Sequence, residues 1–81
     1  MAKFPIVSIV SDEWPRVVRF RLYNGARGEV ADCLVYLEKT NVSSGRCQFS
    51  GYTTQFGGHQ YSCKGEYWWE TKIGYLVVET G

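Results

Sequence analysis

The chain has 81 residues, of which 44% are hydrophobic and 21% are charged, and its formal net charge is +1. A chain of this length supports one small core, and this balance of apolar and charged residues is that of a folded domain rather than a disordered segment. A net charge so close to zero argues against both an acidic DNA mimic and a strongly basic nucleic-acid coat. We therefore expect residues 1–81 to form a single domain.

The first predicted elements are two strands, at residues 4–10 and 16–23. The first segment is rich in β-branched residues, and a turn-forming segment follows it. In the second segment every other residue is apolar, at Val18, Phe20 and Leu22, which is the period of a strand with one buried face. Together the two segments predict an antiparallel hairpin.

Residues 28–40 fit both a helical and an extended period. The helical period gathers apolar residues on one face, at Val30, Cys33, Leu34 and Leu37. An extended period places Asp32 and Glu38 among apolar residues, which disfavours a strand. We expect an amphipathic helix that is capped by Gly28 and ends at Asn41.

A second hairpin is predicted around Gly57-Gly58, a two-residue turn signal. Centring the turn there pairs Tyr52 with Cys63, and a last strand follows at residues 73–79. The resulting order is ββαβββ, an α+β fold in which an antiparallel sheet of about five strands carries one amphipathic helix. The alternative is an all-β small barrel.

The adjacent residues Trp68 and Trp69 carry the main functional prediction. Consecutive strand residues point to opposite faces, so the two indoles cannot share one core. The predicted register places Trp69 under the helix and Trp68 on the other face, across from Gly74. The expected partner-binding surface consists of Trp68, Phe49, Leu76 and Val78, with Arg46 and Lys64 at its rim. Local packing of Trp68 over Gly74, or burial of the patch under the first hairpin, is the competing interpretation.

A basic stretch gives the alternative function, the binding of single-stranded nucleic acid. Its cations are Arg16, Arg19, Arg21 and Arg27, and Trp14 and Tyr23 are candidate stacking platforms for bases. The competing interpretation is that arginines which alternate with apolar residues form the hydrated face of a half-buried strand.

No catalytic, metal or cofactor site is predicted. Cys33, Cys47, His59 and Cys63 have the composition of a zinc site, but on one strand His59 and Cys63 would lie about 13 Å apart, too far to share an ion. The same separation excludes a pairing of the Cys63 thiol with His59 as its base. Three cysteines without a secretory signal indicate reduced thiols, and we expect Cys33 and Cys47 to be small buried hydrophobes.

Location and function follow from these exclusions. Asp12-Glu13 interrupts the amino-terminal apolar run before it reaches signal-peptide length, and no apolar segment approaches the roughly 20 residues of a membrane span. We expect a cytoplasmic, non-enzymatic binding protein, an inhibitor or accessory factor of the kind that phages and other mobile elements encode. Its expected partner is another protein or a second copy of itself, with no membrane and no small-molecule substrate.

Overall fold

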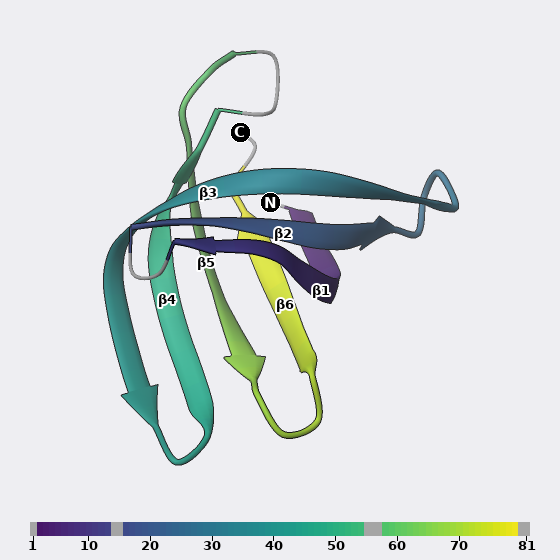
Figure 1. Cartoon of the computed structure of the whole chain (residues 1–81). Helices are drawn as coiled ribbons and strands as arrows, with labels where there is room; N and C mark the ends of the chain where they lie inside the picture. The colour runs from purple at the N-terminus through teal and green to yellow at the C-terminus, as the bar shows by residue number, and fades with distance from the viewer. Residues whose placement is uncertain (1, 14–15, 55–57, 80–81) are drawn as a thin grey trace.

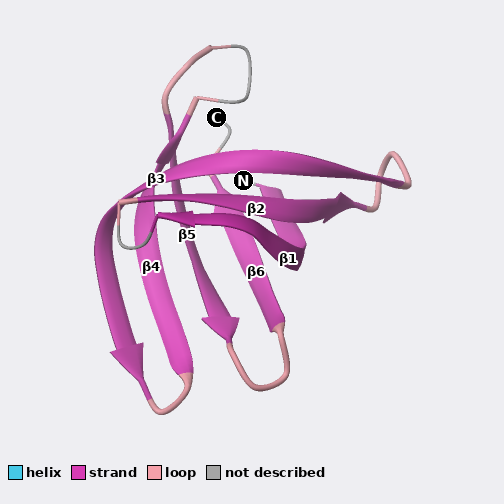
Figure 2. Ribbon diagram, viewed as in Figure 1, coloured by secondary structure: helices cyan, strands magenta, loops and turns pink. Residues whose placement is uncertain are grey.

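The computed structural model describes residues 2–13, 16–54 and 58–79, which form antiparallel strands and no helix (Figures 1 and 2). The strands are β1 (Ala2–Glu13), β2 (Val17–Asn24), β3 (Glu29–Ser43), β4 (Arg46–Thr53), β5 (Tyr61–Trp68) and β6 (Ile73–Val78). Each strand pairs with the next, and β6 pairs with β1, so the sheet closes into a barrel. The α+β fold with its helix is therefore wrong, and the alternative, a small all-β barrel, is right. No helix able to cross a membrane occurs in the described part of the chain.

Two strands bend so that successive segments of each strand pair with different neighbours. Residues 2–5 of β1 pair with β6, and residues 6–13 pair with β2. In the same way residues 29–36 of β3 pair with β2, and residues 36–43 pair with β4, with a register shift between Leu37 and Lys39. In Figure 1 the β1 and β2 strands consequently run across β4, β5 and β6, with β3 continuing from one group into the other.

Glycines permit the close strand approaches that this bending requires. Gly51 lies opposite the irregularity in β3, and a β-carbon there would overlap the carbonyl oxygen of Tyr36. A β-carbon on Gly65 would overlap the carbonyl oxygen of Tyr75 and lie 2.8 Å from the Phe49 ring. Glycine inside a strand is typical of such corners in small barrels.

Residues 29–43 form a strand, and the inner face of this strand is apolar from Ala31 to Leu37, within the region predicted as a helix. The interior-facing residues are Ala31, Cys33, Val35 and Leu37, of which Cys33 and Val35 are buried in the core. Asp32, which disfavoured a strand, faces outward, where the Arg21 side chain of β2 lies 3.1 Å away. The sequence matched a helical period only because the outer face of this strand also carries apolar residues.

The β4–β5 register is one residue away from the predicted one. Tyr52 pairs with Ser62, and Gly51 pairs with Cys63. β4 ends at Thr53 and β5 begins at Tyr61, so the connection is longer than the two-residue turn that Gly57-Gly58 indicated. Because side chains alternate between the faces of a sheet, this difference of one residue places every β4 side chain on the opposite face, relative to β5, from the predicted one.

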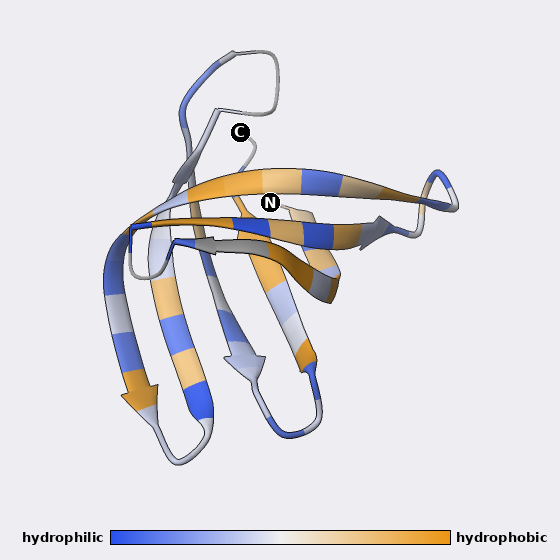
Figure 3. Ribbon diagram, viewed as in Figure 1, coloured by the Kyte–Doolittle hydropathy of each residue, from blue (hydrophilic) through white to orange (hydrophobic). Residues whose placement is uncertain are grey.

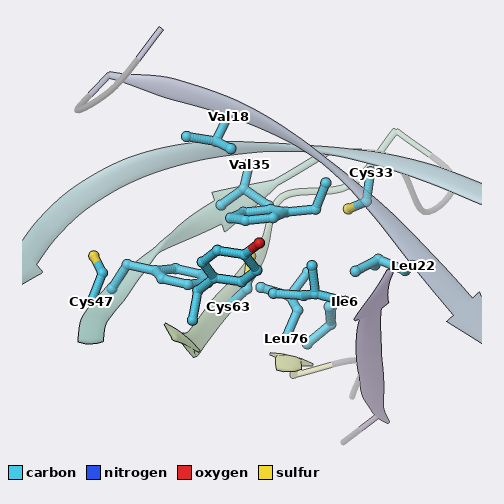
Figure 4. Packing of buried hydrophobic residues seen from close by; sticks show 12 residues of the cluster. Ile6, Val18, Leu22, Cys33, Val35, Cys47, Cys63 and Leu76 are labelled. Carbon is cyan, nitrogen blue, oxygen red and sulfur yellow. The ribbon is translucent and has the colours of Figure 1, made fainter. Parts of the chain in front are cut away.

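The core fills the barrel with residues from every strand (Figure 4). Val18, Phe20 and Leu22 are all buried, which confirms the alternation predicted for β2. The Phe20 ring stacks on Phe49 at a centroid distance of 5.1 Å, joining the two crossing groups of strands. Thr53 is buried too, and its hydroxyl donates to the Leu34 carbonyl oxygen at 2.7 Å, which satisfies its hydrogen-bonding requirement.

Candidate functional site

The clearest candidate site lies at the end of the barrel that carries the β3–β4 and β5–β6 turns, the lower end in Figure 1. Arg46, Trp68 and Ile73 lie side by side across β4, β5 and β6. Each is next to an interior residue, so all three face outward. Arg46 and Trp68 are half-buried, whereas Ile73 is 62% exposed.

Trp69 belongs to the turn that follows β5 rather than to the strand. Its ring meets the buried Tyr67 ring edge-on, with centroids 6.2 Å apart and an interplanar angle of 88°. Its backbone N–H donates to the Gly45 carbonyl oxygen at 3.1 Å, which ties the β5–β6 turn to the β3–β4 turn. Trp69 remains 42% exposed, so it is not the core residue that the sequence predicted.

We call Arg46, Trp68, Trp69 and Ile73 the tryptophan end. The ion pairs found among the described residues, Arg21 with Asp32 and Arg27 with Glu29, leave the Arg46 guanidinium available. Figure 3 shows that the start of β6 is strongly hydrophobic at this end, beside polar turns. Large exposed apolar side chains next to an unpaired cation are the composition of a protein-binding surface.

The structure brings together only part of the predicted partner-binding surface. Trp68 faces outward as expected, and Arg46 lies next to it. Phe49, Leu76 and Val78, by contrast, lie in the barrel core, with Phe49 only 4% exposed. They were expected on the Trp68 face because the predicted registers were wrong by one residue on both sides of β5, where Trp68 in fact pairs with Ile73 and not with Gly74.

Lys64, the remaining predicted rim residue, is exposed on the outer face of β5. It lies four residues before Trp68, about 13 Å away along an extended strand, so it does not border the tryptophan end. It instead lines a shallow depression of about 480 Å³ together with Lys3, Glu66 and Tyr75. Much of the polar surface there is already engaged, since the Lys3 ammonium lies 4.4 Å from the Tyr75 ring centroid and Gln48 donates to Glu66 at 2.9 Å.

The basic stretch of the nucleic-acid alternative is only partly assembled. Arg19, Arg21 and Tyr23 share the outer face of β2 and are exposed, and Arg16 lies exposed in the turn before that strand. Arg21 and Arg27, however, each lie 3.1 Å from a carboxylate oxygen. Trp14 lies outside the described residues.

The cysteines are interior residues. Cys33, Cys47 and Cys63 are free and buried, which confirms the expected burial of Cys33 and Cys47. Burial raises the pKa of all three thiols, and the neighbouring Cys33 contributes to raising the pKa of Cys63 to about 12. His59 is exposed beside the Tyr61 ring. The described residues include no cluster of histidine, cysteine and carboxylate side chains suited to a metal ion.

Sequence reasoning missed Trp69 and Ile73 as surface residues. It extended β5 through Trp69, although the polar run Glu70-Thr71-Lys72 was a signal that a turn was near. Comparisons of the chain with protein-family models, with curated proteins and with solved structures give no match.

Proposed function

We propose that this protein is a non-enzymatic binding protein that docks on another protein through the tryptophan end. The observation that supports the proposal most strongly is the exposure of Trp69 and Ile73 next to Trp68 at one end of a closed barrel. We place the protein among small cytoplasmic inhibitors and accessory factors, including those of phages and other mobile elements.

Docking removes the exposed apolar side chains of the tryptophan end from water. A tryptophan side chain buries roughly 150 to 250 Å² when it is enclosed, and each buried Å² of apolar surface is worth about 25 cal/mol. Trp69 is held against Tyr67, so docking costs less side-chain entropy than it would for a freely rotating ring. The tryptophan end is therefore a partly ordered apolar surface, which favours binding.

The surroundings of the two indoles indicate the chemistry of the partner. An apolar cleft is required to enclose the Trp69 ring and the Ile73 side chain. Arg46 lies beside Trp68 on the outer face and forms no ion pair with a described residue, so a carboxylate at the rim of that cleft is the complementary group. Interface hot spots are enriched in tryptophan and arginine.

The proposal is tested with single substitutions at the tryptophan end. The native chain is used to capture partners from extracts of its host, and calorimetric titration then compares the affinities of the native and variant chains for the captured protein. We expect Trp69→Ala and Ile73→Ser each to weaken binding about tenfold or more, which corresponds to roughly 1.4 kcal/mol. Trp68→Ala should act in the same direction, because its ring lies between Arg46 and Ile73.

Tyr23→Ala is the matched control. Tyr23 is 42% exposed, as Trp69 is, but it lies near the β2–β3 turn, so its removal should leave the affinity unchanged. The Tm of each variant should stay within a few degrees of the native value, because none of these side chains belongs to the barrel core. Native affinity in the Trp69→Ala and Ile73→Ser variants, or equal loss in Tyr23→Ala, would contradict docking through this end.

A further inference from the structure

The last part of β3 has one edge that pairs with no described strand. β2 pairs with β3 only as far as Tyr36, and the N–H of Leu37 donates to the Arg16 carbonyl oxygen at 2.9 Å. From Lys39 to Ser43 the strand pairs only with β4, and all five of these residues are exposed. In Figure 1 this edge faces away from the rest of the barrel.

The turn between β3 and β4 determines which backbone groups point along this edge. Its two residues, Ser44 and Gly45, both have positive φ, at 51° and 76°, as in a type I′ hairpin turn. The flanking residues Ser43 and Arg46 therefore form a hydrogen-bonded pair, and hydrogen-bonded and non-hydrogen-bonded pairs alternate from there. Thr40 and Val42 consequently direct their N–H and C=O groups away from β4.

The side chains at this edge add an apolar component. Thr40 and Val42 pair with the buried residues Phe49 and Cys47, so they lie on the interior face of the sheet. Val42 is nevertheless 60% exposed, because none of the described strands lies beyond it. A strand added along this edge would cover Val42 and pair the free backbone groups.

We propose that two copies of this chain pair through their β3 edges, antiparallel and around a twofold axis at Asn41. In this register Thr40 of each copy lies opposite Val42 of the other, so the outward backbone groups of one copy meet those of its partner. Lys39, the one charged residue in the segment 39–43, lies opposite a serine, which avoids a like-charge contact. The edge is thus self-complementary in hydrogen bonding, in charge and in the burial of Val42. This inference does not depend on the proposed function.

The pairing is tested by sedimentation velocity of the full chain over a wide concentration range. The native chain should form a concentration-dependent dimer. Val42→Pro removes an N–H that points along the free edge and takes no part in the β3–β4 ladder, so it should raise the dimer dissociation constant at least tenfold. Its Tm, measured in parallel, should stay close to the native value.

Charge substitutions at Asn41 test the axis itself. Asn41→Lys and Asn41→Asp each place like charges opposite one another across the twofold, so each variant alone should sediment as a monomer. An equal mixture of the two variants should restore the dimer, because opposite charges then face each other. The same substitutions at Ser62, an exposed residue of β5 that pairs with Tyr52 and lies on neither edge of β3, should leave the native dimer intact and serve as the control.

Two results would overturn the pairing. One is a native chain that remains monomeric at every concentration, which would leave the β3 edge to a strand from a different protein. The other is a native dimer that survives Val42→Pro and both single charge variants at Asn41, which would place the contact elsewhere on the barrel.

Discussion

The missing side chain of Gly65 determines how closely β5 approaches its surroundings. A β-carbon at this position would overlap the backbone oxygen of Tyr75 and lie 2.8 Å from the Phe49 ring. The Phe49 ring is itself stacked on Phe20 in the centre of the core, so it has little room to retreat. A change of a single atom at Gly65 therefore strains both the strand pairing and the core.

We expect Gly65→Ala to lower the free energy of unfolding by about 2 to 3 kcal/mol, as overpacking of a well-filled core does. Urea unfolding followed by tryptophan fluorescence measures the change. Gly25→Ala is the control, because the nearest atom to a β-carbon there is Tyr23 Cε2, at an ordinary contact distance of 3.6 Å. The control should change stability by less than about 0.5 kcal/mol. Equal effects of the two substitutions would contradict the packing account of Gly65.

At the scale of the element, β2 and β3 explain which parts of the fold the sequence could predict. β2 has a single buried face with regular alternation, so its strand and its interior residues were predicted correctly. β3 has apolar residues on both faces and a register shift where it bends, which made its pattern resemble a helix. Only the pairing of this segment with β2 and β4 distinguishes a strand from a helix. A single sequence does not state which strands will be neighbours.

The prediction of the candidate site was limited in the same way. Alternation alone required only that one of the two indoles face outward, and Trp68 does so, whereas the predicted positions of Phe49, Leu76 and Val78 depended on registers across two hairpins. An error of one residue in each register placed these core residues on the surface. Local alternation was therefore predictable, and relations between strands were not.

The outer face of β2 yields a prediction about nucleic acid. Because carboxylates neutralise Arg21 and Arg27, we expect the native chain not to be retained on single-stranded DNA or RNA at an ionic strength of about 0.15 M. Asp32→Asn combined with Glu29→Gln should create retention that falls with added salt. Retention of the native chain that Arg19→Glu with Arg21→Glu abolishes would contradict this and favour the nucleic-acid alternative.

At the scale of the whole molecule, the buried thiols link barrel stability to pH. Burial holds the pKa of Cys63 at about 12 in the folded chain, above the ordinary value of 9.0 that it regains on unfolding. The unfolded chain therefore binds fewer protons between these values, so this contribution to stability is complete below pH 9 and is lost as the pH rises toward 12.

We expect the free energy of unfolding to fall between pH 8 and pH 10.5, and to fall less steeply in Cys63→Ala, as chemical denaturation at each pH will measure. Alkylation offers an independent check, because the native thiols should react far more slowly at pH 8 than those of the denatured chain. An identical pH dependence in Cys63→Ala, or rapid alkylation of the native chain, would show that this thiol is not shielded as the structure indicates.

The pairing of β1 with β6 has a consequence for how the protein is made. Ala2 lies opposite Val78, so the barrel joins residues from nearly opposite ends of the described chain, whereas the other strand pairings link sequence neighbours. During translation the earlier hairpins are able to form while β6 is still inside the ribosome. Until β6 emerges, β1 and β5 lack their β6 partner, and the nascent chain exposes two unpaired strand edges that are prone to pair with other chains.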